Sequence, residues 1–211
     1  GELRVGVVSL DTIGYFHDGV VRVRLAALAR GLDLDQVVVA STHQHQGQDT
    51  MGLWGPSSLS RSIDEAYLAR VEATAVDALE AALGALHEVS ITVARGGAPE
   101  LVSDSRLPEV VDDTFTLVRF DDLAGTTRAT WTIWGNHPEA LGGDNRAITS
   151  DYPHQLRERL EAEYPGSTAV FSAGSLGGLM NPLDIVGCPD ADGRATCVPG
   201  DFALADYVGR G

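Results

Sequence analysis

Short continuous apolar runs alternate along this chain with longer segments that have helical spacing. Apolar and β-branched residues predominate at positions 4–10 and again at 36–41, which is typical of buried strands. Between them, residues 20–29 have the spacing of a helix, and Gly31 is a suitable stop. A strand, a helix and a second strand within about 40 residues predict a βαβ unit with parallel strands.

The next segment predicts a longer helix that begins near residue 62 and runs to about residue 86. Ser62 and Glu65 have the spacing of a capping box at its start. The apolar stripe expected along this helix consists of Ile63, Tyr67, Val71, Val76, Leu79, Leu83 and Leu86. Such a stripe indicates packing against the rest of the protein.

The middle of the chain has the period of two that is typical of strands. Residues 89–94 form one predicted strand, and residues 115–120 and 128–134 alternate around the polar turn at 121–125. Two alternating runs that flank a short turn predict a β-hairpin, in which the strands are antiparallel.

The last third predicts one more helix and one more strand. Ser150 is the expected N-cap of a helix over residues 151–164, and residues 168–171 read as a short strand. Residues 174–182 form a glycine-rich loop, and the chain beyond Asp184 is expected to be irregular. The fold class predicted from these elements is α/β, with a mixed, mostly parallel sheet, flanking helices and one antiparallel hairpin.

Length and end sequences bear on domain organisation. A chain of 211 residues suits a single domain over 1–211. The chain opens within a few residues of a strand and stops abruptly after a polar segment. We therefore expect an incomplete portion of a larger catalytic domain, whose leader is not present in this chain.

Charge and composition narrow the function. The net charge is −15 and all 15 basic residues are arginine, so nucleic acid is a poor partner for this chain. No apolar run approaches the ~20 residues that span a bilayer, so we expect no integral membrane protein. Cys188 and Cys197 lie nine residues apart, which leaves open a local disulfide in a secreted or extracytoplasmic protein or two free thiols.

Histidines follow two of the predicted strands. His43 and His45 come directly after the strand at 36–41, and residues two apart in extended chain point the same way. His137 follows the strand at 128–134, and it approaches the others if both strands share one sheet. Imidazole nitrogen is a common zinc ligand, so a metal site is one interpretation of these histidines. The alternative is that they are solvated at strand ends or bonded to backbone groups in a turn. The three should then lie well within about 10 Å of one another, given nitrogen–zinc bonds of about 2 Å.

The order of several short blocks resembles the neutral/alkaline ceramidase family, in its N-terminal catalytic domain. The resemblance covers about residues 4–182. The matching blocks are Thr42-His43-Gln44-His45-Gln46-Gly47, Arg106, Asn136-His137-Pro138-Glu139, Ser150-Asp151 and the loop with Gly177-Gly178.

This resemblance implies roles for individual residues. It implies that His43 and His137 bind a zinc ion (Zn²⁺), that His45 faces the reacting centre as a catalytic residue, and that Arg106 steadies the substrate carbonyl. Backbone amides near Gly177 and Gly178 would form an oxyanion hole, although such glycines also suit a plain tight turn.

Two departures from the family pattern affect the predicted chemistry. Met180 stands where the family has its nucleophilic serine, and the family's remaining zinc ligands, a glutamate and a tyrosine, lie later in its chain than this sequence reaches. The expected function is a zinc-dependent amidohydrolase that acts on an N-acyl sphingoid or related small-molecule or lipid amide. The alternatives are a zinc hydrolase of another ester or amide, and a non-catalytic scaffold.

Overall fold

The computed structural model describes residues 3–57, 62–176, 179–185, 188, 197, 198 and 200–210. The chain divides into two compact units. Unit 1 comprises Gly1–Ser41 and Gln48–His87, and unit 2 comprises Thr42–Gly47 and Glu88–Gly211. That the chain is one incomplete domain stays a prediction.

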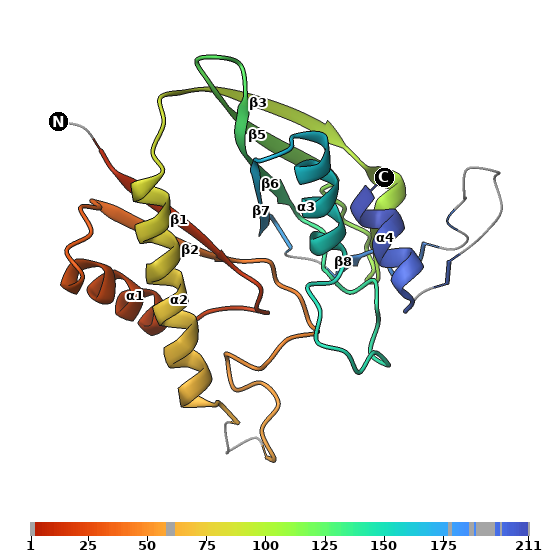
Figure 1. The fold of residues 1–211 in the computed structure, drawn as a ribbon. Coiled ribbons are helices and arrows are strands. Elements are labelled where there is room, and N and C mark those ends of the chain that lie inside the picture. The colour runs from red at the N-terminus through yellow and green to blue at the C-terminus, as the bar shows by residue number, and fades with distance from the viewer. Residues whose placement is uncertain are drawn as a thin grey trace. The chain divides into compact units, whose positions relative to one another are not determined.

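Unit 1 contains the predicted βαβ unit. Strands β1 (Val5–Leu10) and β2 (Gln36–Ser41) pair in parallel, and α1 (His17–Ala29) connects them. Helix α2 (Glu65–Gly84) packs with α1 against the same strands (Figure 1). The buried core of unit 1 consists of Val8, Val23, Ala27, Val37, Ala75, Val76 and Leu79. Helix α1 begins three residues before the predicted start.

Helix α2 begins and ends differently from the prediction. Its N-cap is Asp64, whose carboxylate accepts hydrogen bonds from the amides of Ala66 and Tyr67. The capping box at Ser62 is therefore wrong, because the helix begins at Glu65 and Asp64 is the residue that directly precedes its first turn. The helix ends at Gly84, and Leu86 is 70% exposed, so the predicted stripe extends too far.

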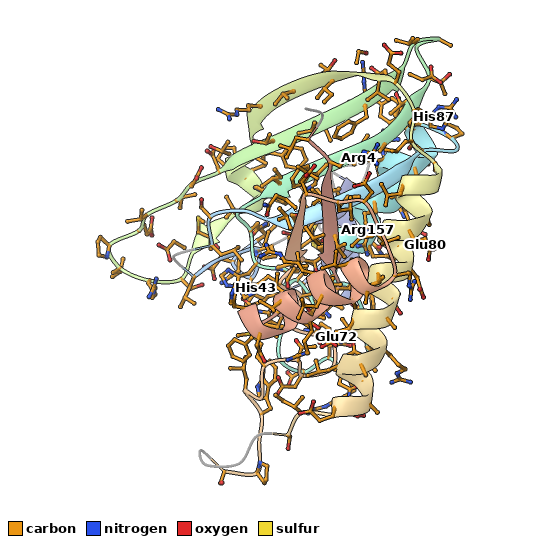
Figure 2. All side chains as sticks on the ribbon, turned by 90° about the vertical axis from the view of Figure 1, so that its left-hand side faces the viewer. Arg4, His43, Glu72, Glu80, His87 and Arg157 are labelled. Carbon is orange, nitrogen blue, oxygen red and sulfur yellow. A yellow bond between two sulfur atoms is a disulfide. The ribbon has the colours of Figure 1, made fainter. Side chains whose placement is uncertain are left out.

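One carboxylate joins the two helices of unit 1. Glu72 on α2, labelled in Figure 2, accepts hydrogen bonds from the guanidinium of Arg22 at 2.6 Å and the hydroxyl of Tyr15 at 3.2 Å. Burial, together with the Glu72 charge, raises the pKa of Tyr15 to about 12. This contact fixes α1 against α2 at the edge of the core.

Unit 2 is built on a four-stranded mixed sheet in the order β3-β5-β6-β7. The strands are β3 (Val89–Gly97), β5 (Thr114–Asp122), β6 (Thr127–Trp134) and β7 (Thr168–Ala173). The β5–β6 hairpin is confirmed, β3–β5 is also antiparallel, and β6–β7 is parallel. The α/β class with a mixed sheet is thus confirmed, but antiparallel pairs take a larger share than predicted.

Two helices pack on this sheet around a second core. Helix α3 (Tyr152–Glu163) lies against β7, and α4 (Phe202–Arg210) lies beside α3 (Figure 1). The main buried residues of this core are Trp134, Leu141, Tyr152, Leu156, Phe171, Leu204 and Val208. The irregular structure predicted beyond Asp184 is therefore wrong for α4. Leu204 and Val208 are its buried i, i+4 pair, a signal that is weak in so short a segment.

The remaining short elements complete unit 2. A 3₁₀ turn spans Pro99–Leu101, and β4 (Ser103–Asp104) pairs with β8 (Met180–Asn181), a strand inside the predicted glycine-rich loop. Cys188 and Cys197 form a disulfide, as one of the two alternatives predicted. Among the described residues, no helix combines the length and the apolar character that crossing a bilayer requires.

Candidate metal centre

Three histidine rings meet in unit 2. The ring centroids are 5.0 Å apart for His43 and His45, 4.8 Å for His43 and His137, and 5.7 Å for His45 and His137. One nitrogen from each ring lies within 4.8 Å of the others. The predicted convergence of the three rings is confirmed, since the ring centroids lie well within about 10 Å of one another.

The path by which these rings converge differs from the prediction. In the described part of the chain, β2 and β6 belong to different sheets, so a shared sheet does not align His43 with His137. His43, labelled in Figure 2, follows β2 but has a left-handed backbone with φ of 66°, so the extended geometry assumed for His43 and His45 is also wrong. This conformation costs a non-glycine residue about 1–3 kcal/mol, and such costs concentrate at functional sites.

Glutamine side chains hold the segment 42–47 in place. The side-chain oxygen of Gln44 accepts a hydrogen bond from the Gln46 amide at 2.5 Å. Gln46 donates to the Gly142 carbonyl at 3.0 Å and accepts from the Asn145 amide group at 2.7 Å. The two bonds of Gln46 join the segment to Gly142 and Asn145, in the loop between β6 and α3 that also carries His137.

A backbone carbonyl sets the tautomer of His137. Its Nδ1 lies 2.7 Å from the carbonyl oxygen of Met180, which also accepts the His137 amide at 2.9 Å. Because a carbonyl can only accept, Nδ1 carries the proton and Nε2 keeps its lone pair. His137 is buried, with 7% exposed. The ring therefore offers Nε2 as a metal donor.

A carboxylate does the same for His45. Nδ1 of His45 lies 2.8 Å from Oε1 of Glu139, and Nε2 is buried with no hydrogen-bond partner among the described residues. The hydrogen bond from His45 holds the pKa of Glu139 below its usual range, against burial, which acts in the other direction. An ionised carboxylate accepts from Nδ1, so the lone pair of His45 is again on Nε2.

Sequence reasoning missed the role of Glu139. The signal that was present is a carboxylate two residues after His137, in a turn that Pro138 initiates. What could not be foreseen is that its partner is His45, which lies 94 positions earlier in the sequence.

The turn that carries His137 follows a tight contact between two strand ends. A Cβ atom added to Gly135 would lie 2.6 Å from the carbonyl oxygen of Ser175, and one added to Gly174 would lie 3.0 Å from the Gly135 nitrogen. Only glycine permits this approach of two backbones. The ends of β6 and β7 therefore come together directly before Asn136.

The other predicted site residues lie beside the histidine cluster or are not among the described residues. Arg106 is exposed and lines a hollow of about 550 Å³ together with Ser175 and Met180. Met180 links this hollow to the cluster, since its carbonyl holds His137. Gly177 and Gly178 lie outside the described residues. The carbonyl-binding role of Arg106 and the oxyanion role of the two glycines stay predictions.

The donor set suits a zinc ion in chemistry and nearly in spacing. Tetrahedral zinc with nitrogen bonds of about 2.0–2.1 Å places its ligand nitrogens roughly 3.4 Å apart. The nitrogens here lie within 4.8 Å of one another, so small ring movements close the set. Within the described part of the chain, Nε2 of His45 is buried without a partner, so it keeps a free lone pair beside the nitrogens of His43 and His137 that would hold the ion.

Comparisons with known proteins bear on the fold. No family model matches the sequence, and no curated protein matches it. Among solved structures, the neutral ceramidase from Pseudomonas aeruginosa has a TM-score of 0.79 at 17% identity, and a ceramidase complexed with C2 has a TM-score of 0.78 at 16% identity.

Both matches cover 96% of this chain and 34% of the solved one. The fold is therefore that of neutral ceramidases, as the sequence resemblance implied. The chain spans about a third of the length of the solved chains that it matches.

Proposed function

We propose that this protein is a zinc-dependent hydrolase of the neutral ceramidase type, which cleaves the amide bond of an N-acyl sphingoid or a related lipid amide. The observation that carries the proposal is the meeting of three imidazoles in a ceramidase fold. The disulfide supports an extracytoplasmic location. Segments of the larger protein would supply further zinc ligands.

The three histidines have two different roles in this proposal, metal binding and proton transfer. His43 and His137 hold the metal, which when bound polarises a carbonyl and makes water a better nucleophile near neutral pH. Nε2 of His45 takes a proton from the attacking water as its oxygen bonds to the carbonyl carbon. The same nitrogen returns this proton to the amine as the C–N bond breaks, a role typically worth ~10²–10⁴-fold in rate.

Groups around these histidines support the reaction without forming or breaking a covalent bond themselves. Glu139 keeps the His45 ring in the tautomer that exposes the Nε2 lone pair. Arg106, from the hollow beside Met180, steadies the developing negative charge on the carbonyl oxygen, with the amides of Gly177 and Gly178.

One observation favours a second candidate. The resemblance places Met180 at the family's serine position, and its thioether has no hydroxyl with which to attack a carbonyl. This supports attack by water on a different amide or ester, or a scaffold without turnover.

Metal analysis combined with a hydrolysis screen separates these candidates. We expect about one zinc per chain and turnover of N-acyl sphingoids above simple N-acyl amides and esters. Turnover of simple substrates alone would support the second candidate. Zinc far below one per chain would contradict both hydrolase proposals.

A further inference from the structure

Asp151 has a backbone conformation that is very unusual for an aspartate. Its φ is 55° and its ψ is −155°, a region that is essentially reserved for glycine, and only 3% of the residue is exposed. Such a conformation persists only where its surroundings fix it. The contacts of the carboxylate show what these surroundings are.

The carboxylate of Asp151 accepts three backbone hydrogen bonds. Oδ1 accepts from the amides of Tyr152 at 2.7 Å and Ala140 at 3.1 Å, and Oδ2 accepts from the amide of Leu141 at 3.0 Å. An ordinary N-cap bonds to amides of its own helix. Here two of the three donors lie outside α3, directly after Glu139.

Tyr152 holds the other end of the same turn. Its fully buried hydroxyl donates to the Asn136 carbonyl at 2.6 Å. Its ring packs edge-on between Trp134 and Phe171 of the sheet, with centroids 5.4 and 5.8 Å away. The turn 136–141 is thus fixed at its start by Tyr152 and at its end by Asp151.

Between the two ends of the turn that Tyr152 and Asp151 hold lie two residues of the candidate metal centre. His137 carries one metal donor, and Glu139 sets the tautomer of His45. Displacement of the end of the turn would move the Glu139 carboxylate away from Nδ1 of His45. It would disturb His137 less, since the Met180 carbonyl holds this ring independently.

We propose that Asp151 is a positioning residue of the candidate metal centre, which acts through the turn 136–141 to fix Glu139 against His45. The proposal rests on the proposed function for its consequence in catalysis, but its geometric content concerns this chain alone. Asp151 contacts neither substrate nor metal in this role.

The first test measures metal binding with Co²⁺ and Zn²⁺ as the probes. We expect Asp151→Asn to weaken zinc affinity about 10–100-fold, because the turn that Asp151 holds also carries the predicted ligand His137, and to change the visible spectrum of the Co²⁺-loaded protein. The matched control is Asp64→Asn, which makes the same exchange at the N-cap of α2 in unit 1 and should leave both readings unchanged. Equal readings for the two variants would overturn the proposal.

A second variant separates positioning from stability. Asp151→Gly removes the carboxylate but relieves the strained backbone, so the fold should be retained. We expect it to bind zinc as weakly as Asp151→Asn does. Asp151→Glu should restore the affinity only in part, since its longer side chain changes the reach to the three amides. A glycine variant with the affinity and Co²⁺ spectrum of the original protein would refute a role for the carboxylate.

A third measurement is independent of metal binding. Nitrogen NMR of the imidazoles in the metal-free protein reports which ring nitrogen carries the proton. We expect a single Nδ1-protonated form for His45 in the original protein and a mixture of tautomers in Asp151→Asn. If the original protein binds no zinc but the tautomers shift, the proposed function fails and the positioning role stands. An unchanged His45 signal in Asp151→Asn would refute the positioning role itself.

Discussion

The two histidine-bearing segments of the candidate metal centre are held by different chemistry. Apart from the bond between His45 and Glu139, residues 42–47 are held by the neutral side-chain amides of Gln44 and Gln46, which make separate hydrogen bonds. The turn 136–141 is held by the buried carboxylate of Asp151, whose backbone is strained, and by the buried phenol of Tyr152, which is adjacent in sequence. The first segment should therefore lose its position gradually, and the second should lose it as a unit.

This difference has a physical origin in burial. A half-buried amide can exchange a lost partner for water, whereas a carboxylate inside the core has no such substitute. Burial raises the pKa of Asp151, while its three backbone donors act in the opposite direction. The turn 136–141 thus depends on a group that is costly to leave unpaired.

The largest expected effect comes from removing either predicted metal ligand. His43→Ala and His137→Ala should each abolish stoichiometric zinc and reduce hydrolysis by more than the ~10–100-fold that loss of an outer-shell partner causes. Zinc per chain and kcat/KM measure both. His154→Ala is the control, since this exposed histidine pairs with Glu158 on α3. If only one of the two variants loses zinc, the segments do not share a metal.

The next effect concerns the carboxylate that the turn presents to His45. Glu139→Gln should lower kcat about 10–100-fold with little change in KM, because an amide no longer fixes the His45 tautomer. Glu163→Gln, on the exposed end of α3, serves as the control. A fall confined to KM would mean that Glu139 binds substrate and does not orient the ring.

A smaller effect is expected in the segment held by amides. Gln46→Ala removes two side-chain hydrogen bonds and should lower the free energy of unfolding by about 1–3 kcal/mol, at ~0.5–1.5 kcal/mol per bond. Gln48→Ala, two residues on and exposed, should change it by much less. Urea denaturation gives both values. A loss of zinc affinity as large as that of Asp151→Asn would break the distinction between the two segments.

The smallest effect lies outside both segments, in the wall of the hollow. Backbone hydrogen bonds from Val110 and Arg106 hold the pKa of Asp104 below 3.8. Its stabilising contribution is therefore present above pH 3.8 and lost as the pH falls through the folded-state pKa. Asp104→Asn should destabilise the protein at neutral pH, and the difference in unfolding midpoint should shrink as the pH falls through the folded-state pKa of Asp104. A difference that does not change with pH would show that Asp104 acts without its charge.

The elements with regular periodicity could be predicted from the sequence. The βαβ unit over residues 4–41 and the hairpin over residues 115–134 follow from apolar patterns that local geometry enforces. Cap residues could not be chosen, because Ser62 and Asp64 are both good candidates and only the three-dimensional path selects one. Helix α4 was missed because its apolar face is only two turns long.

The site could be predicted in part. Spacing and order singled out His43, His45 and His137, and the three rings do meet. The contacts that orient them could not be predicted, because Glu139 and Met180 reach their partners only through the tertiary fold. Nor could the left-handed backbone at His43, since nothing in a Thr-His-Gln sequence requires it.

The hydrogen bonds that hold His137 have a consequence for how position 180 can evolve. Met180 holds the ring through its main chain, which every amino acid shares. A different side chain at position 180, for instance in Met180→Ser, would leave these main-chain hydrogen bonds intact and place a hydroxyl at the margin of the hollow. The orientation of the His137 imidazole and the identity of the nucleophile can therefore change independently of each other in this protein.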